Sequence, residues 1–436
     1  MSRVPAIGRD ATEDFAHTPH GRISVGAFCA DVQAVAETLP ATHHVINLCQ
    51  DRYRFMACFF AAALRGQTTL LPARREADAI ASLRATYPDA RVVADTAFDD
   101  ADQQLTLTPG EHGTAASPLL ATDQLVALPF TSGSTGEPQP HAKTWGMLAR
   151  WRQSHAGSLR ETGPMGLVAT VPCWHMYGLE WVMLLATSAP VTVWCGPDFF
   201  PEDVAAAIRA LGSPVALVST PFHLRHLMTS NADKPPVHTV VSATAPIEPS
   251  LVTRLERECG CRVLEIYGCT EAGTLAWRQP SSVSAWRFYD YVDLRYDNGT
   301  MTVSAPELGS DVILADRFLP QDANTWALEG RAADIVKIAG KRESLTRLNA
   351  LLCSLDGVVD GVFYSPPALG LPETGRLGAL VVAPGLQPRD IRAALARQID
   401  PAFLPRPLRV VEALPRNHQS KLTQADLRSL ALTRDG

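Results

Sequence analysis

The chain has 436 residues, of which 46% are hydrophobic and 19% charged, and its formal net charge at pH 7 is −6. This length is sufficient for a large core and suggests two or more domains, and the composition is ordinary for a soluble globular protein. A small negative charge spread over the whole chain argues against nucleic acid or an anionic membrane as the main partner.

The sequence shows no membrane-spanning, secretory or metal-cysteine signal. The longest apolar stretch, Phe55 to Leu64, is too short to span a bilayer, and the N-terminus lacks a basic-then-apolar signal pattern. Nine cysteines are present without zinc-type spacing, since Cys259 and Cys261 are separated by one residue only. We expect most of them to be buried thiols in a reducing cytoplasm.

Helical and strand-like segments alternate through the first part of the chain. Residues 1–22 are expected to form an extended or poorly ordered lead-in, and residues 100–123 a surface connection. The hydrophobic pattern predicts helices at 24–39, 52–65, 145–159 and 201–211, and strands at 45–48, 68–71, 215–218, 238–242, 264–266 and 299–303. This alternation predicts parallel sheets with helical crossovers.

The pattern of predicted helices and strands changes after residue 330. The pattern there predicts a small α+β unit, with helices at 347–355 and 388–399 and strands at 335–338, 358–364, 377–382 and 408–411. We therefore predict an α/β protein with a large domain of mixed and parallel sheets at 1–330 and a small α+β domain at 331–436. The boundary is expected near residues 331–334.

Two glycine-marked motifs, more than a hundred residues apart, each follow an apolar run. They are Thr131-Ser132-Gly133-Ser134-Thr135-Gly136-Glu137-Pro138 and Tyr267-Gly268-Cys269-Thr270-Glu271. Each indicates a buried strand that ends in a turn with hydroxyls and free backbone N–H groups, which suits a polyphosphate. A carboxylate beside a threonine in the second motif suits a magnesium ion held against phosphate oxygens. Together the motifs predict nucleotide chemistry.

The two motifs and their order resemble those of the adenylate-forming enzymes, a superfamily of acyl- and aryl-CoA synthetases, adenylation domains and luciferases. The first loop fits neither the Walker pattern nor the dinucleotide pattern. The resemblance covers nearly the whole chain, and the elements after residue 330 resemble the mobile C-terminal domain of this family. It implies that ATP and Mg²⁺ activate a carboxylic acid as an acyl-adenylate, with release of pyrophosphate, before the acyl group passes to a thiol.

The resemblance also implies roles for individual residues. Lys421, in the segment Leu414–Leu422, is the implied catalytic lysine that bridges the substrate carboxylate and the α-phosphate, Glu271 is the magnesium ligand, and His175 lies near the carboxylate. The implied nucleotide-binding residues are Thr131, Ser132, Gly133, Ser134, Thr135, Gly136, Ala243, Thr244, Ala245, Pro246, Glu265, Ile266, Tyr267, Gly268, Thr270, Asp316 and Arg331. Those of the acyl pocket are Trp174, His175, Tyr177, Gly178 and Ser219.

Within this set the resemblance places Tyr267 near the adenine and Asp316 on the ribose hydroxyls, with Arg331 on ribose and phosphate. Ala243 and Thr244 replace two glycines of the family's adenine segment. That loop must therefore avoid positive φ or tolerate it at some cost.

Further departures concern the small domain and the phosphate loop. Ser420 stands where the family has glycine, and Ala333 replaces the aspartate that serves as hinge in many relatives. Gln139 replaces a lysine, so a cation near the β- and γ-phosphates is absent at its usual place. Lys143, four positions on, is the candidate substitute.

The compact length, Gln139 and the brief segment after Glu271 resemble the ligases of aryl-polyene and xanthomonadin pigment pathways. Those enzymes activate a hydroxybenzoate-type acid for a carrier protein, so the implied substrate is 4-hydroxybenzoate or a close aromatic acid. The implied acceptor is the phosphopantetheine arm of a carrier protein, or CoA.

Three alternatives remain open. The first is a medium-chain or β-hydroxy fatty acid ligase. The second is a non-catalytic adenylate-binding protein. The third is a thiol acyltransferase that uses Cys173 beside His175, although no third orienting group is evident.

Overall fold

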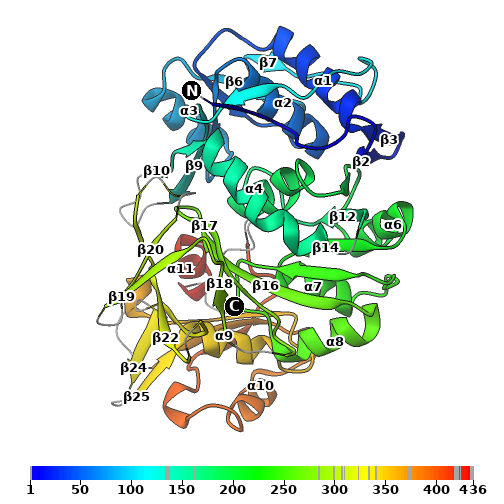
Figure 1. Ribbon diagram of the computed structural model, residues 1–436. Coiled ribbons are helices and arrows are strands. Elements are labelled where there is room, and N and C mark those ends of the chain that lie inside the picture. Colours follow the sequence, from blue (N-terminus) through cyan, green and yellow to red (C-terminus); the bar gives the residue numbers. More distant parts are fainter. Residues whose placement is uncertain are drawn as a thin grey trace.

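Two β-sheets and the helices packed between and outside them form the frame of the large domain (Figure 1). The computed structural model describes residues 2–132, 138–160, 163–282, 285–297, 300–305, 308, 310–322, 324–331, 334–338, 341–370, 376–416, 422 and 424–432. The structure has a large N-terminal domain and a smaller C-terminal domain.

The first sheet has the strand order β10-β9-β5-β4-β6-β7, and β11 also pairs with β9. Its strands are β4 (His44–Asn47), β5 (Thr68–Leu71), β6 (Arg91–Ala94), β7 (Gln103–Gln104), β9 (Leu125–Ser132), β10 (Pro138–Pro140) and β11 (Lys143–Thr144). Strands β4, β5, β6, β7 and β9 run parallel, whereas β10 and β11 fold back antiparallel on β9.

The second sheet has the order β18-β17-β16-β15-β14-β12-β13-β2-β3. Its strands are β2 (Asp14–Thr18), β3 (Gly21–Ser24), β12 (Met165–Ala169), β13 (Val191–Trp194), β14 (Val215–Ser219), β15 (Thr239–Ser242), β16 (Arg262–Cys269), β17 (Gly273–Arg278) and β18 (Arg287–Phe288). The six strands from β16 to β2 are parallel, which confirms the predicted crossover arrangement.

Helices fill the space between the sheets and cover their outer faces. They are α1 (Val25–Thr38), α2 (Arg52–Leu64), α3 (Ala77–Thr86), α4 (Trp145–Arg160), α5 (Met176–Gly178), the π-helical turn η1 (Leu179–Leu184), α6 (Pro201–Leu211), α7 (Pro221–Thr229) and α8 (Pro249–Cys259). One buried cluster joins α1, α2, α4 and η1 to both sheets, while α3 covers the outer face of the first sheet and α6, α7 and α8 that of the second. The order of layers is therefore helix, sheet, helix, sheet, helix.

Local sequence sets the ends of these helices. The Ser24 hydroxyl accepts from the backbone N–H of Ala27 at 3.2 Å, and the Asp51 carboxylate accepts from that of Arg54 at 2.8 Å. Both are N-caps, which satisfy donors that the first turn leaves free. The helix α6 begins at Pro201, the residue type that suits a first helical position.

A β-rich region follows the second sheet and leads to the small domain. Its strands are β19 (Asp293–Asp297), β20 (Thr300–Ser304), β21 (Val312–Ile313), β22 (Asp316–Pro320) and β23 (Trp326–Arg331). The small domain consists of β24 (Ile335–Ile338), β25 (Lys341–Ser344), α9 (Leu345–Cys353), β26 (Asp360–Tyr364), η3 (Pro367–Leu369), β27 (Gly378–Val382), α10 (Pro388–Leu395), η4 (Pro401–Phe403), β28 (Leu408–Val410) and α11 (Gln424–Leu432). In Figure 1 its α9 and α10, in orange tones, lie at the bottom beside α7 and α8.

The prediction for the start of the chain, residues 1–22, is wrong in part. The segment is extended but not poorly ordered, because β2 lies parallel to β13 in the second sheet and Phe15 is fully buried. The strand β1 (Arg3–Pro5) pairs with β8 (Leu119–Ala121), so part of the predicted surface connection is also built into the fold. Short strands with mixed polarity carry too weak a period to be detected.

Candidate active site

Several of the predicted site residues that the structure describes lie where parallel strands end. β9 ends at Ser132, β14 at Ser219 and β15 at Ser242, and the second motif occupies the end of β16. The carboxyl ends of parallel strands share one edge of a sheet, and ligands of open α/β sheets bind outside that edge. Within the second sheet, the topology therefore brings the segments that follow β12, β14, β15 and β16 to one edge.

The second motif forms a tight turn between β16 and the antiparallel β17. A β-carbon added at Gly268 would come within 2.3 Å of the carbonyl oxygen of Gly273, so the close approach of the two strands requires glycine there. The register shifts between Tyr267 and Gly268, which marks a bulge. The turn carries Glu271 at its tip, with 41% of its side chain exposed.

The turn faces the strand that precedes the phosphate loop. The hydroxyl of Thr131 lies 2.9 Å from Nε2 of His141, and the same nitrogen lies 3.9 Å from Oε1 of Glu271. Burial lowers the pKa of His141, while the Glu271 carboxylate raises it. His141 thus lies between Thr131 of the first motif and Glu271 of the second.

Two charged residues lie behind this turn. Lys143 is only 4% exposed, and its ammonium donates to the main-chain oxygen of Glu271 at 2.7 Å. Glu180 is 3% exposed, and its Oε2 accepts from the backbone N–H and the hydroxyl of Thr274 at 3.0 and 2.7 Å. Burial raises the pKa of Glu180 to about 7, against the opposing effects of Thr274 and Lys143. Lys143 therefore contacts the main chain of the turn that carries Glu271.

The adenine segment keeps a left-handed backbone conformation at Thr244, where the family has glycine. Thr244 has φ of +79°, a left-handed conformation that is costly for a β-branched residue. Thr244 and Ala245 are exposed, whereas Ala243 is buried and Pro246 half-buried. The loop is anchored at its far end, where the N–H of Ile247 donates to Glu265 at 3.0 Å.

Glu265 and Ile266 are buried in the structure. One oxygen of Glu265 accepts from Ile247, and the other accepts from Arg278 at 2.6 Å. Ile266 is 6% exposed and belongs to the central core. The contacts of Glu265 thus tie β16 to the adenine segment.

The residue predicted to hold the ribose hydroxyls, Asp316, contacts the second motif. The hydroxyl of Tyr267 donates to Oδ2 of Asp316 at 2.8 Å, and the ring of Tyr267 packs edge-on against Phe318. Asp316 and Arg331 are directly opposite each other in the β22–β23 hairpin. Three residues that are far apart in sequence are thereby placed at one corner.

The acyl segment runs from Trp174 to Gly178. A β-carbon at Gly178 would come within 2.1 Å of the carbonyl oxygen of Pro172, so glycine is required by the sharp turn. The Trp174 ring lies 6.0 Å from the Phe55 ring, and the Arg75 guanidinium lies 3.9 Å above it. His175 precedes α5 and is half-buried.

The hydroxyl of Tyr177 ties two strand ends together. It lies 3.1 Å from the main-chain oxygen of Ser219 and 2.8 Å from that of Val241. The Ser219 hydroxyl in turn lies 2.7 Å from that of Thr170. These contacts join the acyl segment to the ends of β14 and β15.

Cys173 is a poor nucleophile. It is 2% exposed, and burial raises the pKa of its thiol to about 11. Because the thiolate is the reactive form, this environment argues against the thiol acyltransferase alternative. All nine cysteines are free thiols, and seven of them are buried.

Several predicted residues lie outside the part of the chain that the structure describes. They are Gly133, Ser134, Thr135 and Gly136 of the phosphate loop, Ala333 at the predicted hinge, and Ser420 and Lys421 of the closing segment. The flanks of the closing segment are described: Arg416 forms an isolated antiparallel bridge with Leu422, and its guanidinium donates to both oxygens of Asp360 at 2.6 and 2.8 Å.

A magnesium ion fits this site only in company with phosphate. Among the described residues, no three His, Cys, Asp or Glu side chains are grouped so that they could hold a metal by themselves. Mg²⁺ is commonly held by one or two carboxylates together with substrate phosphates. The exposed carboxylate of Glu271 opposite the phosphate-loop strand matches that donor set.

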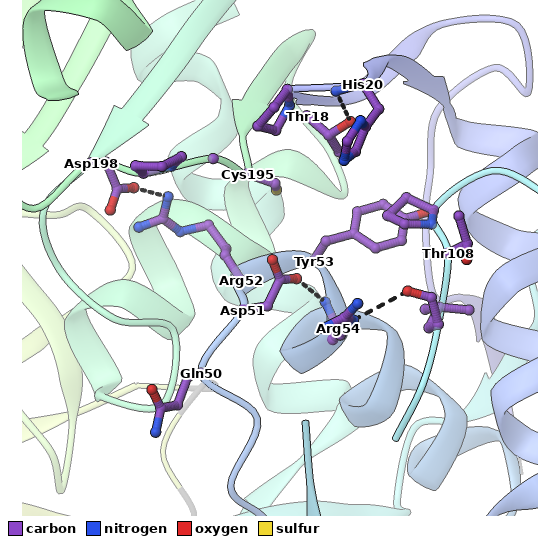
Figure 2. A pocket seen from close by; sticks show the side chains of 15 residues that line it. Thr18, His20, Gln50, Asp51, Arg52, Tyr53, Arg54, Thr108, Cys195 and Asp198 are labelled. Carbon is purple, nitrogen blue, oxygen red and sulfur yellow. Dashed lines mark hydrogen bonds and ion pairs between the residues drawn. The ribbon is translucent and has the colours of Figure 1, made fainter. Parts of the chain in front are cut away.

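A separate cavity of about 650 Å³ lies at the N-terminal end of α2 (Figure 2). None of the predicted site residues is among those that line it. Arg52 there pairs with Asp198 and donates to the main-chain oxygens of Trp194 and Ala169, and Arg54 donates to that of Leu107. These guanidinium groups are thus bonded within the protein.

Sequence reasoning missed His141 and Glu180. Glu180 interrupts an apolar run and His141 follows the first motif by a few residues, but neither feature indicates a contact with the turn of Glu271. Lys143, the predicted substitute for the missing lysine, contacts the turn that carries Glu271. The described part of the chain contains no helix with the length and hydropathy needed to cross a membrane.

Comparisons with known proteins agree with this geometry. A family profile described as AMP-binding enzyme matches residues 21–307. A 4-coumarate–CoA ligase of Halorhodospira halophila is 30% identical over 306 residues, which cover 67% of this chain and 73% of that protein. One of Rhodobacter capsulatus is 28% identical over 307 residues, covering 68% and 74%.

The fold is shared with a solved structure. The o-succinylbenzoate coenzyme A synthetase of Bacillus subtilis, in complex with AMP, superimposes with a TM-score of 0.80 at 15% identity and covers 99% of each chain. The family profile extends over more than half of the sequence. This chain therefore belongs to the AMP-binding enzyme family, the adenylate-forming enzymes related to acyl- and aryl-CoA ligases.

Proposed function

We propose that this protein joins an aromatic carboxylic acid to AMP and then passes the acyl group to a thiol. The observation that carries the proposal is the meeting of the two glycine-marked motifs, in which His141 lies between Thr131 and Glu271. A polyphosphate bound across these motifs would have hydroxyls on one side and a metal-binding carboxylate on the other.

In the first step a carboxylate oxygen attacks the α-phosphorus, the bond from that phosphorus to the bridging oxygen breaks, and pyrophosphate leaves. Mg²⁺, when bound, would neutralise phosphate charge. Glu271 would hold it, Tyr267 and Asp316 would orient the nucleoside, and Lys421 would place an ammonium between the two anions. In the second step the thiol displaces AMP after the small domain has turned, a hinge motion that we place near residues 331–334.

The aromatic substrate class is supported by the named relatives and by the acyl segment. The two bacterial relatives are 4-coumarate–CoA ligases. Trp174, with Phe55 beside it and Arg75 over its ring, offers a flat aromatic surface next to His175. We propose 4-hydroxybenzoate or a close aromatic acid, on the resemblance to the compact pigment-pathway ligases, and CoA or a carrier-protein phosphopantetheine as acceptor.

The test is acid-dependent exchange of labelled pyrophosphate into ATP across a panel of 4-hydroxybenzoate, 4-coumarate, octanoate and a 3-hydroxy fatty acid. The proposal predicts the highest kcat/KM with an aromatic acid. A preference for the aliphatic acids would favour the fatty acid ligase, and ATP binding without exchange for any acid would favour a non-catalytic adenylate-binding protein.

A further inference from the structure

The turn that carries Glu271 is held by two buried charged residues that the adenylation chemistry itself does not use. We propose that Lys143 and Glu180 are positioning residues that clamp this turn and set the direction of the Glu271 carboxylate. The proposal rests on the proposed function, since it assumes that Glu271 faces the metal and the nucleotide.

The clamp holds the turn at two places, its tip and the start of β17. On one side the Lys143 ammonium donates to the main-chain oxygen of Glu271 at 2.7 Å. On the other side Glu180 accepts two hydrogen bonds from Thr274, the second residue of β17. The indole N–H of Trp181 donates to the same Thr274 hydroxyl at 2.9 Å, which fixes that hydroxyl from a third direction.

Glycine packing shows how closely Glu180 fits the turn. A β-carbon at Gly273 would lie 2.2 Å from Oε1 of Glu180, so the carboxylate occupies the space that any other residue would need. Gly273 also has φ of +75°, a conformation that favours glycine. The turn is therefore shaped around the Glu180 carboxylate.

The chemistry of burial argues for a specific role. A buried ammonium and a buried carboxylate are costly to remove from water, and apolar residues of similar volume are often at least as stabilising. The Lys143 ammonium bonds the backbone at Glu271, and the Glu180 carboxylate bonds the backbone at Thr274. The Glu271 side chain itself stays 41% exposed. Such groups position a metal ligand through hydrogen bonds to its surroundings, as outer contacts do in metal sites generally.

The same arrangement bears on the departure at Gln139. Gln139 is exposed on β10 and pairs in register with Thr131. His141 and Lys143 follow on the same short segment, one beside the Glu271 carboxylate and one beneath its main chain. This chain thus directs its nearby lysine to the metal-binding turn.

The test compares Lys143→Met with Arg152→Met in the full-length protein. Arg152 is a matched control because it is also 4% exposed and also donates to main-chain oxygens, those of Pro5 and Ala6, at 2.8 and 2.7 Å. Binding of Mn²⁺–ATP, followed by the electron paramagnetic resonance signal of free Mn²⁺, provides a readout that does not depend on turnover.

We expect Lys143→Met to weaken Mn²⁺–ATP binding at least about 10-fold. Arg152→Met should lower the melting temperature and leave Mn²⁺–ATP binding unchanged. The double variant Lys143→Met/Glu180→Gln removes both buried charges and guards against misfolding of the single variant. It should fold and still bind Mn²⁺–ATP weakly. Lys143→Arg should recover part of the affinity.

Wild-type affinity in a folded Lys143 variant, or in the double variant, would overturn the proposal, as would equal weakening by Arg152→Met. These results are distinguishable from failure of the proposed function. In that case the wild-type protein would bind Mn²⁺–ATP but form no AMP with any acid, while the binding comparison would still decide the clamp.

Discussion

The nucleotide end and the acyl end of the same sheet edge are built in different ways. At the predicted nucleotide end, the main chain of Glu271 accepts a hydrogen bond from Lys143, and the carboxylate of Asp316 accepts one from the Tyr267 hydroxyl. At the acyl end, the Tyr177 hydroxyl and Ser219 are engaged with the ends of β14 and β15. Phosphate and metal need fixed charges and donors, whereas a flat acid needs mainly a shaped wall.

The comparison explains why one end identifies the chemistry and the other leaves the substrate open. The charged groups at the nucleotide end serve the adenylation step that the family shares, so they form a motif that can be recognised in the sequence. The surroundings of Trp174 consist of packed hydrophobic side chains. Many different sequences can produce such packing, so it does not identify a substrate. Mutations should therefore act on turnover at the first end and on stability or acid preference at the second.

The largest effect is expected from a residue that belongs to neither end. Lys421→Ala should lower acid-dependent adenylation by about 10²–10³-fold, as expected for loss of one transition-state donor. Thioester formation from supplied acyl-adenylate should be largely retained, since that step does not need the lysine. The two half-reactions are measured by pyrophosphate exchange and by thioester release, and equal losses in both would contradict the assigned role.

The next effect concerns the nucleotide end. Glu271→Gln should weaken the apparent Mg²⁺ affinity at least about 10-fold, because even residues that only support a metal ligand contribute that much. A titration of turnover with Mg²⁺ at fixed ATP measures it. Glu258→Gln, in an exposed ion pair on α8, serves as control, and an unchanged Mg²⁺ dependence of Glu271→Gln would count against the ligand assignment.

A pair of tyrosines tests the contrast directly. Tyr177→Phe removes the hydroxyl that joins β14 and β15, so the free energy of unfolding should fall by about 1–2 kcal/mol. Tyr267→Phe removes the bond to Asp316 and should instead raise the KM for ATP. Denaturant unfolding and pyrophosphate-exchange kinetics on both variants decide the matter, and a reversed pattern would break the distinction between the two ends.

The smallest effect is expected in the adenine segment. Thr244→Gly should raise the free energy of unfolding by about 1 kcal/mol, because relief of the left-handed strain exceeds the added flexibility of the unfolded chain. Ala245→Gly, beside it, should lower stability by about 0.5 kcal/mol. Urea denaturation of the two variants checks this, and a destabilised Thr244→Gly would show that the threonine side chain supports the loop.

Much of the fold was predictable, because its helices are periodic and its central strands are continuous apolar runs. The helix predicted at 201–211 and the strand predicted at 68–71 begin and end where expected. The lead-in was missed, since β2 joins the sheet through pairing with β13, a contact between distant parts of the chain. Residue type and local hydrophobic period do not predict pairing between distant strands.

The candidate site was predictable where a motif marks it and not where burial decides. Thr131 and Glu271, one from each motif, both lie near His141. The positions of Lys143 and Glu180 could not be inferred, because a charged residue is usually exposed, and only the packed turn shows that these two are buried. His141 was hidden by its position on a two-residue connection between short strands.

The most direct test of adenylate formation follows an oxygen atom. The acid is supplied with both carboxylate oxygens labelled with ¹⁸O, and the AMP released after complete turnover to thioester is analysed by mass spectrometry. Attack of the carboxylate on the α-phosphorus predicts one labelled oxygen in each AMP. Unlabelled AMP, or label in inorganic phosphate with ADP as product, would contradict it.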